Sequence, residues 1–235
     1  DIDEEFIRRS LQTIPTKEVG NLYKVVWPGT LEPIYSNNLY GIRDWRTNYR
    51  PTYGKETNEE ANDFNDLIDF THTLDSNNRT QLKAYLESNL DVDSWLRTLA
   101  VSIYLGNPDD YRGNANNYYL YFNQQRYLTY IPFDFDHSLG QGWDGSPVFI
   151  NYSLDNDIYT WEGDGFSSNT SDIPLVDQIL QFEEYRIQYE NYLELFIENG
   201  IFSYDSFSEL FDISYALYGD EFNMYNNKQY YIETK

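Results

Sequence analysis

The chain has 235 residues, 40% of them hydrophobic, so it is long enough to bury a sizeable core. Its 16 basic and 39 acidic residues give a net charge of −23, which argues against nucleic acid and anionic membranes as partners and suits either a basic protein partner or a salty, extracellular setting. It has no cysteine, which excludes disulfides, thiol nucleophiles and cysteine zinc sites. The sequence contains neither a signal peptide nor an apolar run of membrane-spanning length.

The first part of the chain alternates predicted helices with loops and one strand. Hydrophobic residues at helical spacing predict the helices, and a β-branched and aromatic run that ends at a Pro-Gly pair predicts the strand. In chain order, these elements are a helix over residues 1–12, a strand over 21–27, a loop-rich stretch over 30–58, a helix around 64–71 and a helix over 79–89.

The middle of the chain combines a helix, a polar loop and a hairpin. Asp91 or Asp93 can cap a helix that ends at Gly106, and a polar loop spans residues 107–116. The runs NYYLYF and RYLTYIPF then predict two strands, which Asn123-Gln124-Gln125 join as a hairpin. This segment supplies the only clear antiparallel pairing that the sequence predicts.

The last third of the chain is predicted to be helical after a long surface excursion over residues 140–173. One long helix is expected from Leu175 to Phe196, followed by one or two helices within 203–224. No internal repeat or linker divides the chain. We therefore expect a single α+β domain over 1–235, mostly helical with a small antiparallel sheet.

Four side chains with oxygen atoms are expected to meet at one end of the hairpin. Because a hairpin returns to its starting end, Asp134 and Asp136 arrive near Asn117, and the loop with Asp109 joins there too. In an extended strand, Asp134 and Asp136 would share one face and repel each other unless a cation lay between them. Oxygen ligands without Cys or clustered His suit Mg²⁺, Ca²⁺ or Mn²⁺.

The order of these residues follows the plan of protein kinases, in which a catalytic Asp precedes an Asn and then, after a short hairpin, a metal-binding Asp. Two alternatives stay open. Asp110 could replace Asp109 as the functional acid, and Asn114 matches the usual kinase spacing better than Asn117. No H-R-D or D-F-G triplet is present in this stretch.

Two lysines are the best candidates to bind phosphate groups. Lys24 lies in the middle of the first predicted strand, where a side chain can be aimed, and Lys55 follows a Tyr-Gly pair. Either lysine could instead be an ordinary solvated residue. The pattern therefore predicts metal contacts at Asn117, Asp134 and Asp136, with Lys24 and Lys55 as the candidates for phosphate contacts.

At these residues the chain resembles the CotH kinase family, the spore coat protein H group of atypical secreted kinases. The resemblance spans most of the chain and is most specific over residues 105–138. The matching motifs are N-x-D-x-Y (Asn107–Tyr111), N-Y-Y-L-Y (Asn117–Tyr121) and I-P-F-D-F-D (Ile131–Asp136), with weaker matches at residues 4–24, Y-x-K-x-T-N (Tyr53–Asn58) and 174–189.

The resemblance implies the large lobe of an atypical kinase, with the small N-terminal lobe absent from this chain. It implies ATP-dependent phosphorylation of protein Ser or Thr with a divalent metal, and a spore-surface or extracellular location. By resemblance, Asp109 is the catalytic acid, Asn117 is a metal or phosphate ligand, Asp134 is the main metal ligand, and Asp136 is a second ligand or supports Asp134.

Two other classes of function have to be weighed. The same oxygen ligands could hold a structural calcium ion in an acidic binding module of a cell or spore surface, because Ca²⁺ and Mg²⁺ both prefer oxygen. A glycoside hydrolase is disfavoured, because its two acids flank a sugar about 5–9.5 Å apart. Carboxylates two residues apart on one strand are poorly placed for that arrangement.

Overall fold

The computed structural model describes residues 2–11, 18–35, 51–61, 63–138, 157–159, 173–200 and 203–218. The chain forms two compact units, each assembled from separate stretches. The first comprises Asp1–Trp95, Asp109–Asp134 and Ser168–Gln181, and the second comprises Leu96–Pro108, Phe135–Ser167 and Phe182–Lys235. One domain over 1–235 stays a prediction, because two compact units can belong to one domain or to two.

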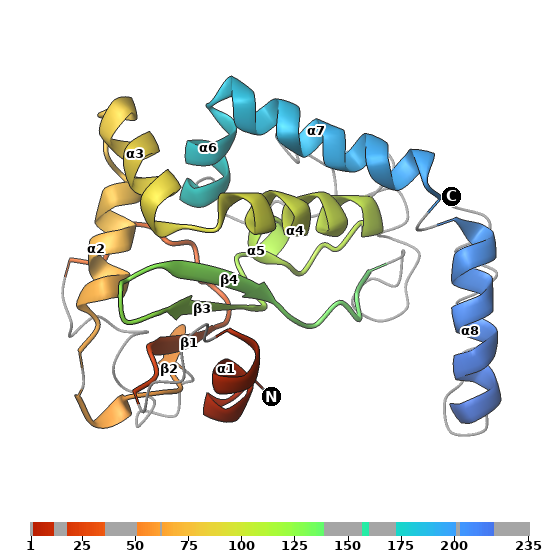
Figure 1. Ribbon diagram of the computed structural model, residues 1–235, viewed down its shortest axis with the longest axis horizontal. Helices are drawn as coiled ribbons and strands as arrows, with labels where there is room; N and C mark the ends of the chain where they lie inside the picture. Colours follow the sequence, from red (N-terminus) through yellow and green to blue (C-terminus); the bar gives the residue numbers. More distant parts are fainter. Residues whose placement is uncertain are drawn as a thin grey trace. The chain divides into compact units, whose positions relative to one another are not determined.

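The described residues form helices and one four-stranded antiparallel sheet, which confirms the predicted α+β class (Figure 1). In chain order the elements are α1 (Glu4–Ser10), β1 (Asn21–Val25), β2 (Tyr53–Lys55), the 3₁₀ helix η2 (Glu59–Ala61), α2 (Asn65–Leu74), α3 (Arg79–Asn89), α4 (Val92–Leu105), α5 (Tyr111–Asn114), β3 (Tyr118–Phe122), β4 (Leu128–Pro132), α6 (Pro174–Leu180), α7 (Glu183–Glu198) and α8 (Tyr204–Tyr218).

The sheet has the strand order β2-β1-β3-β4, with β1 and β3 in the centre (Figure 1). The predicted hairpin is confirmed as the pair β3–β4. Strand β2 lies within the stretch that was predicted to be loop. The prediction missed it because a strand of three residues with a central glycine is too short to show an alternating pattern. One row across the sheet joins Gly54, Lys24, Tyr119 and Ile131.

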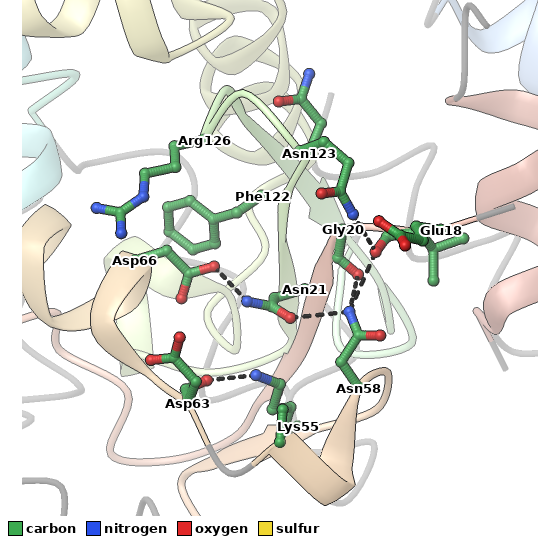
Figure 2. A pocket seen from close by; sticks show the side chains of 13 residues that line it. Glu18, Gly20, Asn21, Lys55, Asn58, Asp63, Asp66, Phe122, Asn123 and Arg126 are labelled. Atoms are coloured by element: carbon green, nitrogen blue, oxygen red, sulfur yellow. Dashed lines mark hydrogen bonds between the residues drawn. The ribbon is translucent and has the colours of Figure 1, made fainter. Parts of the chain in front are cut away.

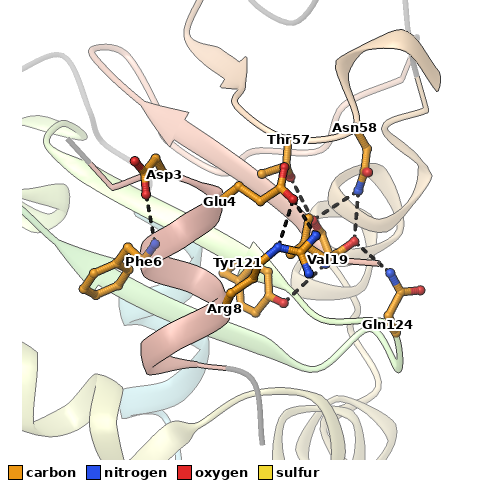
Figure 3. Close-up of polar contacts among 10 residues, drawn as sticks. Asp3, Glu4, Phe6, Arg8, Val19, Thr57, Asn58, Tyr121 and Gln124 are labelled. Atoms are coloured by element: carbon orange, nitrogen blue, oxygen red, sulfur yellow. Dashed lines mark hydrogen bonds and ion pairs between the residues drawn. The ribbon is translucent and has the colours of Figure 1, made fainter. Parts of the chain in front are cut away.

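One face of the sheet packs against α1. Ile7 of this helix is buried in a cluster with Val19, Leu22, Tyr119 and Tyr121. Figure 3 shows the start of the helix, where the Asp3 carboxylate accepts the main-chain N–H of Phe6 at 2.9 Å. Such a cap satisfies one of the amide groups that a helix leaves unpaired at its N-terminus.

The opposite face of the sheet packs against α2 through aromatic rings. Tyr23 of β1 contacts Phe64, just before α2, with ring centroids 5.8 Å apart, and Phe122 of β3 contacts Phe70 of α2 at 5.9 Å. Tyr23 and Phe122 also meet edge to face. This aromatic layer explains why a chain with 24 tyrosines and 14 phenylalanines can form a dense core.

Helix α4 leads directly to the polar loop. Asp91 accepts the main-chain N–H of Ser94 at 3.0 Å, so Asp91, and not Asp93, caps this helix. The helix ends at Leu105, and Gly106 follows with a φ of 62°, a left-handed conformation that glycine adopts without steric cost. The prediction that the helix stops at Gly106 is therefore confirmed.

The long helix predicted from Leu175 to Phe196 is two helices, α6 and α7, which are separated at Gln181 and Phe182. The hydrophobic spacing continues across the break, so the sequence pattern alone did not reveal it. The predicted excursion over 140–173 lies almost entirely outside the described residues. Within the described residues, no helix combines the length and the apolar character that crossing a membrane requires.

Candidate active site

Asp109 lies in a tight turn between α4 and α5, in the first compact unit. Its side chain is only 4% exposed. A buried carboxylate is costly unless hydrogen bonds replace its lost water. The surroundings of Asp109 supply those bonds, as the next residues of the turn show.

Three asparagine amides surround the Asp109 carboxylate. Asn114 and Asn116 donate to its Oδ1 at 2.7 and 3.0 Å, and Asn117 donates to its Oδ2 at 2.8 Å. The amide of Asn117 also donates to the main-chain oxygen of Asp109 at 2.9 Å. The structure thus brings both candidate asparagines, Asn114 and Asn117, to Asp109, so the choice between them stays open.

The charge of Asp109 sets the direction of these amides. An ionised carboxylate can only accept hydrogen bonds, so each amide nitrogen faces it and each amide oxygen faces away. The Oδ1 of Asn116 accepts the main-chain N–H of Trp27 at 2.7 Å. The Oδ1 atoms of Asn114 and Asn117 accept no hydrogen bond from any residue that the structure describes, so their oxygens are available to a cation.

Asp110 has a different partner. Its Oδ1 accepts the main-chain N–H of Gly113 at 2.7 Å, and it is the N-cap residue of the single-turn helix α5. This bond gives Asp110 a structural role in shaping the turn. Between the two acids that the sequence left open, the geometry favours Asp109 as the one surrounded by potential catalytic and metal-binding groups.

The hairpin closes on this turn, as predicted. The main-chain N–H of Phe133 donates to the carbonyl oxygen of Asn117 at 3.1 Å. Asp134 is the next residue along the chain and is exposed. Asp134 is therefore adjacent in sequence to the residue whose backbone bonds to Asn117, and all three residues belong to the same compact unit.

Asp134 and Asp136 would share one face only within a strand, and the structure places both of them after the end of β4. Strand β4 ends at Pro132, and Asp134 adopts a left-handed backbone with a φ of 61°. Asp136 lies in the turn after the strand, and its Oδ1 is 3.6 Å from Nε2 of His137. The alternation rule holds only within a strand, so it cannot place these two carboxylates.

Three non-glycine residues at this end of the hairpin have left-handed backbones. They are Ala115, Asn117 and Asp134, with φ values of 49°, 57° and 61°. This conformation is uncommon for residues with a side chain, and Asn and Asp tolerate it best. Strained residues often cluster at functional sites, where the surrounding structure holds them in place.

The donor set at this end fits a hard cation. Asp134 offers a carboxylate, and Asn117 or Asn114 offers an amide oxygen; such ligands suit Mg²⁺, Mn²⁺ or Ca²⁺. Among the residues that the structure describes, no three His, Cys, Asp or Glu side chains gather at one point. A metal here would therefore depend on asparagine oxygens as well as on carboxylates.

Lys24 lies on the sheet face that α1 covers in part. It lines a cavity of about 320 Å³ together with Gly54, Tyr119 and two carboxylates, those of Asp3 and Glu56. Gly54 stands opposite Lys24 in β2 and has no side chain to fill this space.

Lys24 lies close to the aromatic ring of Phe133, at the end of the hairpin. The Nζ of Lys24 lies 5.2 Å from the ring centroid of Phe133 and 5.6 Å from that of Tyr119. Phe133 is the residue that bonds to Asn117 and immediately precedes Asp134. The cavity thus adjoins the segment that carries the candidate metal ligands.

Lys55 lies on the opposite face of the sheet. It stands across from Tyr23, which neighbours Lys24 in β1 and therefore points the other way. Its Nζ donates to the carbonyl oxygen of Asp63 and lies 5.5 and 5.3 Å from the ring centroids of Tyr23 and Phe64. Burial lowers the pKa of Lys55, against the raising effect of Asp66 and Asp63.

Figure 2 shows the separate cavity that Lys55 lines, which has a volume of about 350 Å³. Three carboxylates line it (Glu18, Asp63 and Asp66) against two cations (Lys55 and Arg126), and the Lys24 cavity has two carboxylates against one cation, so charge does not distinguish the two cavities. Lys24 and Lys55, which were predicted together, lie on opposite faces of the sheet and line separate cavities. Of the two, Lys24 lies near Phe133, which immediately precedes Asp134, and a phosphate contact at either lysine stays a prediction.

Sequence reasoning missed Asn116 and Trp27. Asn116 is the third amide on Asp109, and it connects the turn to the main chain of Trp27. The run of asparagines from Asn114 to Asn117 was a usable signal, because such residues often satisfy buried polar groups in turns. Nothing in the sequence around Trp27 indicates that the loop after β1 reaches this turn.

Comparisons with known proteins place the chain in a family. It is 29% identical over 153 residues to the inner spore coat protein H of Bacillus subtilis (strain 168); the match covers 65% of this chain and 37% of that protein. The chain thus matches little more than a third of that relative's length. No solved structure matches it at a significant level. The family model described as CotH kinase protein matches residues 1–235, so the chain belongs to the CotH kinase family.

Proposed function

We propose that this chain supplies the catalytic and metal-binding residues of a kinase that transfers the γ-phosphoryl group of ATP to Ser or Thr of a protein. Membership of the CotH kinase family supports this reaction class. The observation that carries the proposal is the buried Asp109 carboxylate, which three asparagine amides hold at the closed end of a hairpin.

In this reaction the acceptor oxygen attacks the γ-phosphorus, the bond from that phosphorus to the β,γ-bridging oxygen breaks, and ADP leaves. The acceptor hydroxyl gives its proton to the carboxylate of Asp109. The amides hold both oxygens of Asp109 in place before the acceptor arrives. Positioning and electrostatics of this kind supply most of the acceleration in phosphoryl transfer.

A divalent metal, Mg²⁺ or Mn²⁺, would be held by Asp134 with the amide oxygen of Asn117, and Asp136 would serve as a second ligand or support Asp134. When bound, it offsets the negative charge of the phosphate oxygens. This role suits a chain with a net charge of −23, which would otherwise repel ATP. The ATP would lie on the side of Lys24, whose cavity adjoins Phe133.

The test uses the full-length protein, because this chain spans 37% of its curated relative. With Mg²⁺ and labelled ATP, we expect phosphate on Ser or Thr of the protein itself or of a Ser-rich basic protein. Asp109→Asn and Asp134→Ala should abolish transfer. The matched control is Asp69→Asn, an exposed acid paired with Arg126 at 2.6 Å. Full activity of both site variants would refute the proposal.

The name of the relative supports a second candidate function. That protein is described as an inner spore coat protein, which fits a structural or binding role at the spore surface. Under this alternative, the same oxygen atoms hold a structural Ca²⁺ and no phosphate is transferred. Ca²⁺ takes six to eight oxygens at about 2.3–2.6 Å and Mg²⁺ takes six at about 2.0–2.1 Å, so coordination distances separate the two candidates.

A spore or outer cell surface is the proposed location, on the strength of that relative's name. Immunogold labelling of sectioned spores or cells should then place the protein in the spore coat or at the outer cell surface. Detection in the soluble cell interior alone would contradict this location.

A further inference from the structure

The loop that follows β1 is bound tightly to the turn that carries Asp109. Its backbone spans Trp27 to Thr30, and four hydrogen bonds join it to residues between Tyr111 and Tyr118. The bonds run from Trp27 N to Asn116 Oδ1 (2.7 Å), from Gly29 N to Ala115 O (2.7 Å), from Tyr118 OH to Gly29 O (2.5 Å) and from Tyr111 OH to Thr30 O (3.0 Å).

Gly29 allows this close approach. A Cβ at this position would lie 2.2 Å from Cγ1 of Val25, 3.1 Å from the hydroxyl of Tyr118 and 3.3 Å from the carbonyl oxygen of Ala115. A side chain at this position would have to displace the Val25 side chain and would press on the Tyr118 hydroxyl and the Ala115 carbonyl. The backbone at Trp27 and Gly29 is therefore fixed relative to Asp109, all within one compact unit.

The side chain of Trp27 is not used to hold this loop. It is 53% exposed, although its main-chain N–H is bonded to Asn116. Pro28 beside it is exposed as well, so the two form an apolar patch. A single asparagine side chain, that of Asn116, separates the backbone of Trp27 from the carboxylate of Asp109.

The geometry points to Trp27 as a residue that selects the acceptor polypeptide. This inference rests on the proposed kinase reaction at Asp109. A large aromatic side chain on a fixed backbone gives much contact area at a small entropic cost, which is why tryptophan is enriched in recognition surfaces. The partner that fits the Trp27–Pro28 patch is an apolar or aromatic side chain near the phosphorylated Ser or Thr.

The separation between Trp27 and Asp109 indicates how many positions lie between that apolar residue and the phosphorylated Ser or Thr. An extended chain advances about 3.3–3.6 Å per residue. With one asparagine side chain between Trp27 and Asp109, the selected residue lies about two to four positions from the acceptor hydroxyl. The kinase should therefore prefer peptides with an apolar residue in that window over peptides that carry Gly or Ser there.

The first experiment measures peptide phosphorylation by the full-length protein. Paired peptides differ only in having Leu or Gly at each position from two to four on either side of a single Ser. We expect Trp27→Ala to raise KM several-fold for the Leu peptides and to leave KM for the Gly peptides unchanged. The KM for ATP and the kcat should stay near those of the unaltered protein, and Trp27→Phe should retain most of the preference.

The matched control is Tyr35→Ala. Tyr35 is also an exposed aromatic residue, at 76%, but its ring packs on His72 of α2, with the centroids 4.9 Å apart, and has no bond to the Asp109 turn. This variant should keep the preference for the Leu peptides. Equal loss of preference in both variants would mean that exposed aromatic surface in general, and not Trp27, is responsible.

A second measurement separates this inference from the proposed reaction. The Asp109→Asn variant is tested for binding to the same peptides by fluorescence polarisation, which needs no catalysis. Tighter binding of the Leu peptides that is lost on adding Trp27→Ala supports the inference even if the unaltered protein transfers no phosphate. If transfer occurs but neither KM nor binding depends on Trp27, the role of Trp27 is overturned while the kinase reaction stands.

Discussion

Asn117 accepts the main-chain N–H of Phe133 on its carbonyl oxygen at 3.1 Å, and its side chain meanwhile donates to Asp109. One residue thus connects the acid of the turn to the returning strand. Asp134 follows Phe133 directly, so the backbone of Asn117 determines where that carboxylate begins. The metal proposal depends on this junction, and it can be examined without measuring kinase activity.

We expect Asp134→Ala to weaken Mn²⁺ binding at least tenfold, because the carboxylate is the charged ligand of the proposed site. Electron paramagnetic resonance of free Mn²⁺, titrated with the full-length protein, measures the affinity. Asp136→Ala should have the smaller effect. Asp69→Asn, on the surface, should leave the titration unchanged. Unaltered Mn²⁺ affinity in the Asp134 variant would remove this residue from the site.

Substitutions at the two neighbouring acids should have opposite consequences. Ser can cap a helix as Asp does, so Asp110→Ser should keep the bond to Gly113 and retain phosphoryl transfer. Asp109→Ser should lose transfer, because a hydroxyl cannot replace the carboxylate as proton acceptor. Asp110→Ala should cost about 1 kcal/mol in the free energy of unfolding. Urea unfolding and transfer assays on the three variants check this; inactivity of Asp110→Ser with a normal fold would reverse the assignment.

The two lysines should differ in what their loss affects. Lys24→Met should raise the KM for ATP, because the cavity that Lys24 lines adjoins Phe133 and Asp134. Lys55→Met should leave that KM unchanged and lower stability, because its ammonium group bonds to Asp63 on the other face of the sheet. ATP titrations and urea unfolding of both variants give the comparison. A higher KM for ATP in the Lys55 variant alone would contradict the proposed nucleotide position.

Asn116→Ala should reduce both stability and rate. It removes a donor to Asp109 and the acceptor of the Trp27 N–H, which should cost about 1–2 kcal/mol of unfolding free energy. We expect kcat to fall about tenfold, as for a loss of about 1.4 kcal/mol in the transition state. The control, Asn89→Ala, removes an amide bond to the Tyr85 carbonyl within α3 and should lower stability without lowering kcat.

Stability should fall at alkaline pH. Burial raises the pKa of Tyr111, Tyr118 and Tyr130, and it raises that of Tyr85 to about 12 from a usual value of 10.0, with a contribution from Asp69. Below pH 10 the folded and unfolded chains both keep these protons, so the stability is complete. Between pH 10 and about 12 the unfolded chain loses protons that the folded chain retains. The free energy of unfolding therefore decreases as pH rises through this window.

Titration of the tyrosinate absorbance, with circular dichroism recorded in parallel, checks the alkaline prediction. The buried tyrosines should ionise together with the loss of helical signal. Early ionisation of all tyrosines, near the usual value of 10.0 and with the fold intact, would show that these rings are accessible to water.

Local patterns predicted much of the fold. Helical spacing located α1 and α4, and two aromatic runs around a polar tripeptide located the β3–β4 hairpin. These signals come from consecutive residues, so they survive without knowledge of distant contacts. The approach of the returning strand to Asn117 was also predictable, because a hairpin returns to its starting end.

Features that depend on pairing or on backbone strain were not predictable. The opposite faces of Lys24 and Lys55 follow from the register of β2 on β1, and the three residues of β2 contain no signal of that register. The left-handed backbone of Asp134 arises where the strand ends against Asn117, and the residues around it do not require this conformation. The separation of α6 from α7 likewise interrupts a continuous hydrophobic spacing.

The acid and its three amide partners occupy a stretch in which the outermost members, Asp109 and Asn117, are eight positions apart. One short, continuous segment of the sequence therefore contains the whole arrangement. If the segment Asp109–Asn117 were exchanged as a whole between two related chains, the acid and its amide partners should keep their arrangement. Insertion of a single residue between Asn114 and Asn117 should instead shift the last amide out of reach, so the length of this turn determines whether Asp109 keeps its three amide partners.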